Sequence, residues 1–345
     1  MNPLRSPHKL FAGIPRVSLA NLPTPLTDAV RLREALGGPT RCPRILIKRD
    51  DLTGLAYGGN KVRKLEFLVA DALKQRATTL VTAGAVQSNH CRATVAAGLL
   101  HGLDTWLLLD TDTNVPPLQG NYLLDNLMGA TIRFVHNDDN ASDIRETVLD
   151  EVRSTGGSPY FIPVGGSNPI GSVGYLTMAA ELANQFEALG VAPGLLYYAN
   201  GSRGTQAGIE LGIRLFNLAC RARGVLISHA DAGKDQRGLD NINGAAAIVG
   251  SDIRLTAADI TNVHGYIGEN YAVPTQSGDH AIRLLARTEA IFLDPVYTGK
   301  AMGALIDHIR TGQIEPGETV VFVHTGGSPS IFVHGERLLN SARPG

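Results

Sequence analysis

The sequence is poor in cysteine, and its cysteines do not fall at the short spacings of metal or disulfide motifs. Only Cys42, Cys91 and Cys220 occur among 345 residues, and no CxxC pair is present. This argues against a disulfide framework and against a zinc ribbon. The ten histidines are scattered and show no HExxH or similar ligand spacing. No metal site is therefore expected.

Long apolar runs and an excess of charge are also lacking. No apolar run approaches the roughly 20 residues of a membrane span, and the charged residues within 1–10 are not followed by a long apolar segment. The formal net charge is -1, and no run rich in lysine or arginine stands out. Neither nucleic acid nor a membrane is expected as a partner, and a cytoplasmic protein is indicated.

What the sequence does show is a steady alternation of strand-like and helix-like segments. Strands are expected at residues 45–49, 79–82, 105–109, 131–135, 160–164, 195–199, 225–229, 260–263 and 319–323. Helices are expected from about residue 60 and at 88–100, 118–127, 142–153, 173–189, 205–218, 239–249, 278–287, 300–309 and 331–339. Such alternation implies parallel sheets and an α/β fold.

The length suits about two domains, and no long linker or internal repeat separates them. We therefore expect one domain to be inserted into the other. The smaller α/β domain is placed at 64–174, and the larger cofactor-binding α/β domain at 1–63 and 175–345. In such sheets, ligands bind beyond the carboxyl ends of the strands, where the glycine-rich loops of this chain fall.

Residues 57–67 (YGGNKVRKLEF) contain a paired-glycine turn followed by the start of an amphipathic helix. Gly58 and Gly59 allow the backbone to turn without a Cβ penalty, and Asn60 suits the same geometry. Lys61 is therefore expected in the first helical turn, where the positive end of the dipole disfavours an ammonium group. A neutral amine is easier to maintain there, although position alone also fits an ordinary solvated lysine.

Two further loops each follow an expected strand and open an expected helix. In residues 84–90 (GAVQSNH), Ser88 and Asn89 are good N-cap residue types, and the same groups can hold a small anion such as a carboxylate. In residues 200–208 (NGSRGTQAG), small residues expose backbone N–H groups at the positive end of a helix, which suits a phosphate. The glycine spacing there is neither GxGxxG nor that of a P-loop.

Three more loops have similar compositions, namely residues 165–171 (GGSNPIG), 294–300 (DPVYTGK) and 324–328 (HTGGS). Each has a simple structural explanation as a tight turn, a helix cap or a core position. Together the loops offer a phosphate cup, a carboxylate cup, hydroxyl groups and a lysine on a glycine turn. That combination is what pyridoxal 5′-phosphate chemistry requires, so this cofactor is expected.

With these motifs assembled, the chain resembles the pyridoxal-phosphate family of D-cysteine desulfhydrase and 1-aminocyclopropane-1-carboxylate deaminase, from about residue 19 to residue 339. The motifs that carry the resemblance lie at residues 48–51 (KRDD), 58–66, 87–90 (QSNH), 201–208, 294–300 and 324–327. The resemblance implies pyridoxal-phosphate fold type II, similar to the tryptophan synthase β chain. It further implies two three-layer α/β domains with mostly parallel sheets, and a homodimer.

Carried over residue by residue, the resemblance implies that Lys61 is covalently linked to the cofactor and is catalytic together with Ser88 and Tyr297. The other implied cofactor contacts are Asn60, Lys64, Asn89, Gly201, Ser202, Arg203, Gly204, Thr205, Thr298 and Thr325. The implied contacts to a small amino-acid substrate are Gln87, Ser88, Asn89, His90, Tyr271 and Tyr297.

The substrate expectation depends on two threonines. In the ring-opening deaminases of this family, a glutamate occupies the position of Thr298 and pairs with the pyridine nitrogen, and a leucine occupies that of Thr325. A carboxylate would keep the ring nitrogen protonated and strengthen the electron sink, whereas a neutral hydroxyl would not. Elimination of a good β leaving group needs less carbanion stabilisation than ring opening, so the threonines favour β-elimination.

We therefore hypothesise a D-cysteine desulfhydrase, a carbon–sulfur lyase that yields pyruvate, hydrogen sulfide and ammonia. An L-cysteate sulfo-lyase and a 1-aminocyclopropane-1-carboxylate deaminase are alternatives within the same architecture. Alternatives from another class are a non-catalytic metabolite-binding protein of the same fold and an NAD-binding protein.

Overall fold

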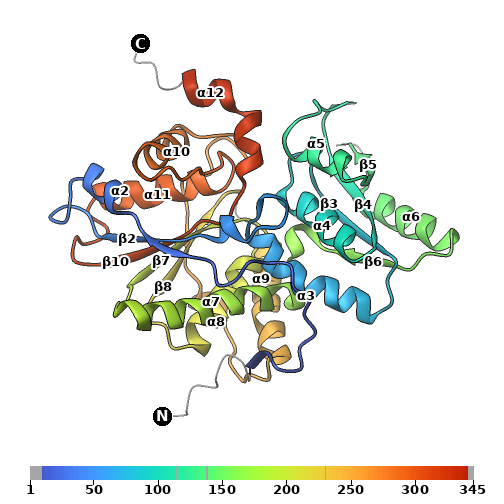
Figure 1. The fold of residues 1–345 in the computed structure, drawn as a ribbon, viewed down its shortest axis with the longest axis horizontal. Coiled ribbons are helices and arrows are strands. Elements are labelled where there is room, and N and C mark those ends of the chain that lie inside the picture. The colour runs from blue at the N-terminus through green and yellow to red at the C-terminus, as the bar shows by residue number, and fades with distance from the viewer. Residues whose placement is uncertain (1–9, 114, 137–138, 230, 341–345) are drawn as a thin grey trace.

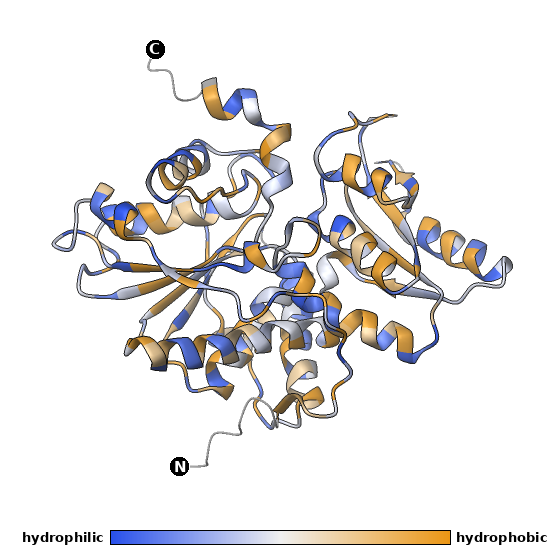
Figure 2. Ribbon diagram, in the orientation of Figure 1, coloured by the Kyte–Doolittle hydropathy of each residue, from blue (hydrophilic) through white to orange (hydrophobic). Residues whose placement is uncertain are grey.

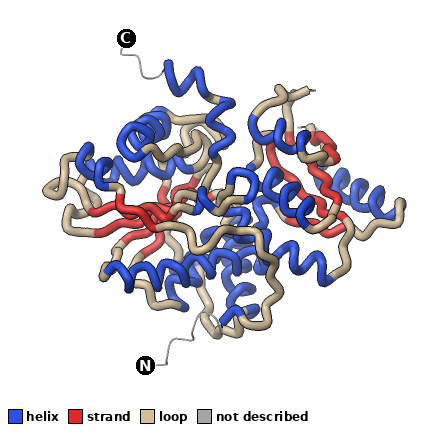
Figure 3. The backbone as a smooth tube through the Cα atoms, viewed as in Figure 1, coloured by secondary structure: helices blue, strands red, loops and turns tan. Residues whose placement is uncertain are grey.

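The computed structural model describes residues 10–113, 115–136, 139–229 and 231–340, and the strands within them form two sheets (Figure 1, Figure 3). In sheet order, the six-stranded sheet consists of β1 (Leu26–Asp28), β2 (Arg44–Lys48), β10 (Thr319–Val323), β7 (Leu195–Asn200), β8 (Arg221–Leu226) and β9 (Asn262–Val263). Only β1 pairs in an antiparallel direction. The four-stranded sheet is parallel, with the order β5 (Thr131–Val135), β4 (Asp104–Asp110), β3 (Thr79–Ala85) and β6 (Pro159–Ile162).

The six-stranded sheet is buried on both faces, as a parallel sheet covered by helices must be. On β10, Val320 and Phe322 pack on the side of α2 (Val30–Ala35), α10 (Gln276–Glu289) and α11 (Thr298–Arg310). Val321 and Val323 face the opposite way and pack against α7 (Pro169–Leu189) and α8 (Gly204–Leu215). Figure 2 shows the resulting hydrophobic strands between the two helical layers.

The four-stranded sheet is covered in the same manner. Its strands pack on one face against α4 (Asn89–Leu100) and α5 (Gly120–Leu127), and on the other against α6 (Ala141–Ser154). Helix α3 (Asn60–Lys74) contacts both α4 and α7, so it lies between the two sheets. Two further helices are α9 (Ala232–Ile248) and α12 (Gly335–Asn340). Two three-layer α/β units with mostly parallel sheets are thereby confirmed.

The predicted strands at residues 131–135 and 319–323 are confirmed to the residue, and most other elements within a few positions. Three predictions are wrong. The strand predicted at 225–229 is β8 at Arg221–Leu226, because its charged first half does not read as a buried strand. Helix α9 begins seven positions before the predicted residue 239, since its first two turns are polar. The helix predicted at 331–339 is a 3-10 segment, Ser328–Val333, followed by α12.

Two elements were not predicted at all, β1 and α2, which are three and six residues long. Segments this short hold too few residues to show a period. The four strands of the smaller sheet are contiguous in sequence, and strands of the larger sheet precede and follow them. The boundaries at residues 64 and 174 stay a prediction, and residues 1–9, on which the expectation of no signal segment rests, lie outside the described residues.

Candidate functional site

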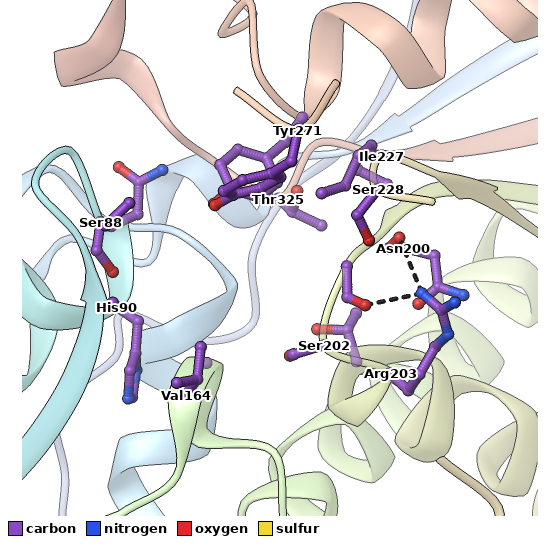
Figure 4. A pocket seen from close by; sticks show the side chains of 18 of the residues that line it. Ser88, His90, Val164, Asn200, Ser202, Arg203, Ile227, Ser228, Tyr271 and Thr325 are labelled. Atoms are coloured by element: carbon purple, nitrogen blue, oxygen red, sulfur yellow. Dashed lines mark hydrogen bonds between the residues drawn. The ribbon is translucent and has the colours of Figure 1, made fainter. Parts of the chain in front are cut away.

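A cavity of about 530 Å³ lies where the carboxyl ends of both parallel sheets meet (Figure 4). Its walls include the residues that end or follow β3, β4 and β6 on one side and β7, β8 and β10 on the other. Open α/β sheets bind ligands at this edge. The residues expected at the site that line the cavity are Asn60, Lys61, Ser88, Asn89, His90, Gly201, Ser202, Arg203, Thr205, Tyr271, Tyr297 and Thr325.

The turn before Lys61 requires glycine at two successive positions. Gly58 has φ +64°, and a Cβ there would lie 2.3 Å from the carbonyl oxygen of Asp51. Gly59 has φ +110°, and its Cβ would lie 3.0 Å from the carbonyl oxygen of Thr325, which also accepts the N–H of Asn60 at 3.0 Å. The paired glycines therefore allow the start of α3 to press against the loop after β10.

Helix α3 is held by a buried ionic network two residues beyond Lys61. Arg63 is fully buried and forms ion pairs of 2.8 Å with both Asp50 and Glu181. Lys48 joins the network through a 2.7 Å pair with Glu181. Lys48 and Asp50 of the KRDD motif therefore support the lysine-bearing helix, and removal of one partner would leave a buried charge without compensation.

Lys61 has the properties that a nucleophilic amine needs. Burial lowers its pKa to about 8, the positive charge of Arg92 acts in the same direction, and Asp294 opposes it. The sequence suggests the positive end of the helix dipole as a cause of a lowered pKa, and the structure adds burial and the charge of Arg92. Among the described residues, the Nζ atom donates one hydrogen bond, of 3.2 Å, to the side chain of Asn60, whose own amide donates to Thr205 at 2.9 Å.

Other buried lysines are already engaged elsewhere. Burial lowers the pKa of Lys300 to about 8, but its Nζ donates to the carbonyl oxygens of Ile267 and Asn270 and it does not line the cavity. Lys64 donates to the carbonyl oxygen of Gly165 at 3.0 Å. Lys61 differs from these lysines, because it is half-buried and lines the cavity.

The loop between β7 and α8 forms an anion cup. The backbone N–H groups of Ser202, Arg203, Gly204 and Thr205 have no hydrogen-bond acceptor among the described residues. They lie at the start of a twelve-residue helix, where the dipole is positive. The guanidinium of Arg203 turns away from the cup and pairs with Asp235 at 2.7 Å. Unsatisfied donors of this kind fit a phosphate group.

A second group of free donors stands opposite, at the start of α4. The N–H groups of Asn89 and His90 also lack an acceptor in the described residues, while Ser88 caps the helix by accepting the N–H of Cys91 at 3.2 Å. His90 is buried and forms a 3.0 Å hydrogen bond with Thr82 through Nε2. Burial holds the pKa of His90 well below its usual value, so the ring is neutral.

Two tyrosines form a further wall of the cavity. Tyr271 and Tyr297 share a short hydrogen bond between their hydroxyl oxygens, and their rings meet edge to face with centroids 6.0 Å apart. Burial raises the pKa of Tyr297 well above its usual value, and burial also raises that of Tyr271. Both phenols are therefore protonated near neutral pH; one hydroxyl proton is shared within the pair, and the other is free to donate a hydrogen bond.

Four residues expected at the site do not line the cavity, namely Lys64, Gln87, Gly204 and Thr298. Thr298 is buried, and its hydroxyl donates to Asp294 at 2.7 Å and accepts the backbone N–H of Asp294. The expected cofactor contact of Thr298 stays a prediction. Gln87 bonds to residues 119 and 121 through its side-chain amide, and its expected substrate contact also stays a prediction.

The cavity also contains residues that were not predicted, including Asp110, Val164, Asn200, Ile227, Ser228, His229, Asp231, Lys234 and Asn270. Asp110 directly ends β4 and pairs in register with Ala85, so the same strand-end rule that identified residues 84–90 predicts its place. Ser228 and His229 were hidden by the misplaced strand. Asn270 lies in an irregular segment that shows no sequence period.

The described residues contain neither a candidate metal site nor a candidate membrane-spanning helix. No group of three or more histidine, cysteine, aspartate or glutamate side chains is arranged to hold a metal ion. No helix within the described ranges combines the length and apolar character that crossing a membrane requires. The buried cysteines 42, 91 and 220 are free.

Comparison with known proteins decides which family this geometry belongs to. A family model described as "Pyridoxal-phosphate dependent enzyme" matches residues 17–326. The chain belongs to the pyridoxal-phosphate-dependent enzyme family. The expected cofactor, fold type II and enzyme class are thereby confirmed.

Two curated relatives and one crystal structure are similar to this chain over nearly its full length. Two curated relatives, from Klebsiella pneumoniae (strain 342) and Salmonella paratyphi C (strain RKS4594), are named D-cysteine desulfhydrase, and each is 40% identical to this chain. The alignments cover 94% and 93% of this chain and 97% and 96% of the relatives. A crystal structure described as an "ACC deaminase homologue" superposes with a TM-score of 0.87 at 36% identity, covering 99% of this chain and 100% of that one.

Pyridoxal 5′-phosphate fits the residues present. The free N–H groups of residues 202–205 suit its phosphate, Lys61 offers a partly neutral amine for its aldehyde, and the hydroxyl of Thr325 lines the same cavity. The hydrogen bond from the Asn60 amide to the Thr205 hydroxyl connects the anion cup of residues 202–205 to the turn that precedes Lys61. The family assignment and the geometry therefore agree.

Proposed function

We propose that this enzyme catalyses the β-elimination of D-cysteine to pyruvate, hydrogen sulfide and ammonia. The observation that carries the proposal is the cavity, which combines an amine of lowered pKa, two anion cups and two protonated phenols. The 40% identity to proteins named D-cysteine desulfhydrase, over nearly the full length of each chain, supports the same substrate.

When bound, the cofactor withdraws electrons from the α-carbon of an amino acid that is linked to it. In our proposal, the N–H groups of residues 202–205 hold its phosphate and Lys61 holds its aldehyde carbon. With cofactor and substrate in place, the amine of Lys61, whose pKa burial lowers to about 8, would be the base that accepts the α-proton.

The start of α4 binds the substrate carboxylate in this scheme. The free N–H groups of Asn89 and His90 and the hydroxyl of Ser88 lie together at the positive end of the helix dipole. Neutral His90 adds no charge of its own, so the carboxylate is held by backbone dipoles and short polar groups. This cup fixes the substrate between α4 and the tyrosine pair.

The tyrosine pair assists the leaving sulfur. Tyr297 and Tyr271 are both protonated near neutral pH, so the hydroxyl proton that is not shared between them can donate a hydrogen bond to the departing sulfur. Thiolate is a good leaving group and needs only a weak electron sink. The neutral hydroxyl of Thr325 in the cavity is consistent with that requirement.

A deaminase acting on 1-aminocyclopropane-1-carboxylate is the second candidate, because a structure described as an ACC deaminase homologue is 36% identical and superposes closely. The experiment is a panel of D-cysteine, L-cysteine, L-cysteate and 1-aminocyclopropane-1-carboxylate. Pyruvate and sulfide from D-cysteine support our proposal. Sulfite from L-cysteate would assign a sulfo-lyase, 2-oxobutyrate would assign the deaminase, and no turnover of D-cysteine would refute the proposal.

We also propose that the enzyme is a cytoplasmic homodimer. Three buried free cysteines suit a reducing compartment. Large apolar side chains such as Phe332 and Tyr57 are 80% and 60% exposed, which fits surfaces that a partner subunit covers. Light scattering on the purified protein tests the dimer, and a monomeric mass would refute it.

A further inference from the structure

Behind the cavity wall, the buried side chain of Arg92 on α4 joins three separate segments. Its Nη1 donates to Asn89 Oδ1 at 2.9 Å and to Asn121 Oδ1 at 2.6 Å. Its Nη2 donates to the carbonyl oxygen of Gly58 at 3.0 Å. The acceptors belong to the start of α4, to α5 and to the turn that precedes Lys61, yet Arg92 itself does not line the cavity.

The hydrogen bonds around Asn89 fix the direction of its amide. Its Oδ1 accepts from Arg92 Nη1 and also from Asn121 Nδ2, at 3.0 Å. An amide oxygen has two lone pairs, and both are used here. The NH2 group therefore points away from these donors, it has no acceptor among the described residues, and Asn89 lines the cavity. Because the buried oxygen of the Asn89 amide accepts both hydrogen bonds, the group that faces the cavity is its NH2 donor.

Asn121 is held in turn by the segment before α4. Its backbone N–H donates to Gln87 Oε1 at 2.8 Å, and its Nδ2 donates to the carbonyl oxygen of Gln87 at 2.8 Å. One turn further along α5 lies the buried carboxyl group of Asp125, which has no hydrogen-bond partner in the described structure and whose charge opposes the desolvation of Arg92. The guanidinium is thus set in place from several sides.

We propose that Arg92, together with Asn121, is a positioning residue of the active site, and that it acts through Asn89 by fixing the side-chain NH2 group as a donor toward bound cofactor and substrate. A free asparagine amide can present either its oxygen or its nitrogen, and the wrong face would place an acceptor against an anionic oxygen. A charge-assisted hydrogen bond behind the amide selects one face. The substrate part of this proposal depends on the function proposed above, whereas the cofactor part does not.

The test is a double-mutant cycle on the full-length enzyme with Arg92→Met and Asn89→Ala. Cofactor affinity is measured by absorbance titration, and KM and kcat are measured with D-cysteine. Loss of a hydrogen bond to a charged group predicts that Arg92→Met weakens cofactor binding and raises KM by about tenfold or more. In the Asn89→Ala background the same change is expected to have a markedly smaller effect on both, because additivity fails for residues that act as one unit; what remains reflects the loss of the Arg92 charge near Lys61 and of its bond to Gly58.

The matched control is Arg133→Met, since this exposed arginine pairs with Glu151 on the surface, and its replacement should leave both quantities unchanged. An equal fold-change from Arg92→Met in both backgrounds would overturn the proposal. If that variant does not fold, as judged by circular dichroism, Asn121→Ala replaces it in the cycle and is read in the same way, with a smaller expected effect of about threefold, because one of two donors to the Asn89 oxygen remains. If wild-type enzyme fails to turn over D-cysteine, the proposed function fails, while the cofactor titration still decides the role of Arg92.

Discussion

The pKa of Lys61 leads to a quantitative prediction for the cofactor-free protein. An amine with a pKa of about 8 is half neutral at pH 8, whereas an ordinary lysine with a pKa near 10.4 is neutral in less than about 1% of molecules at that pH. Lys61 is therefore expected to react with an acylating reagent roughly 100-fold faster than its ordinary pKa would allow. The rate should fall tenfold for each pH unit below 8 and level off above it.

The assay is competitive acylation of the apoprotein between pH 6 and 11, with the extent at Lys61 measured by peptide mass spectrometry against N-acetyl-lysine. A midpoint above pH 10 would refute the argument that burial and Arg92 suppress the ammonium form.

The lowered pKa of Lys61 also determines how the stability of the apoprotein changes with pH. Because the folded pKa lies below the unfolded one, Lys61 is expected to make the apoprotein more stable as pH rises from about 8 to 10.5, and an opposite trend in a Lys61→Met comparison would contradict the direction.

Three further predictions concern the walls of the site. Gly58→Ala should lower the free energy of unfolding by about 1–3 kcal/mol or more, because the new methyl group meets a backbone oxygen at 2.3 Å, whereas Gly129→Ala, with positive φ but open space, should cost less in urea denaturation. Tyr297→Phe should lower kcat about 10²–10⁴-fold with D-cysteine while leaving the melting temperature nearly unchanged; an unaltered kcat would remove its role as a donor. Thr298→Glu should destabilise the protein by about 3–5 kcal/mol rather than create deaminase activity, because the new carboxylate would face the buried carboxylate of Asp294. A stable variant that forms 2-oxobutyrate from 1-aminocyclopropane-1-carboxylate would contradict this prediction.

Strand-and-helix periodicity was sufficient to predict the α/β class and the place of the site. Strand β10 is apolar, and β5 is rich in β-branched and aromatic residues, so local patterns specify both. The rule that ligands bind at the carboxyl ends of parallel strands then brought residues 84–90 and 200–208 together, although they lie far apart in the chain. The lysine turn was predictable because a glycine pair, which can adopt positive φ, directly precedes an amphipathic helical pattern.

Side-chain direction was not predictable in the same way. Thr298 and Thr325 have similar local sequences, yet one hydroxyl turns toward Asp294 and the other lines the cavity. The difference depends on the helix start at Thr298, where four donors converge on one carboxylate. Arg92 was missed for a related reason, since its acceptors come from three segments that only the tertiary fold brings together.

The most direct test of the account is to identify the lysine that carries the cofactor. Native protein is reduced with borohydride, digested and examined by mass spectrometry. We expect the phosphopyridoxyl label on the peptide that contains Lys61, and we expect Lys61→Ala to lose it together with the yellow colour. A label on Lys64, Lys234 or Lys300, or no label after incubation with excess pyridoxal 5′-phosphate, would contradict the site described above.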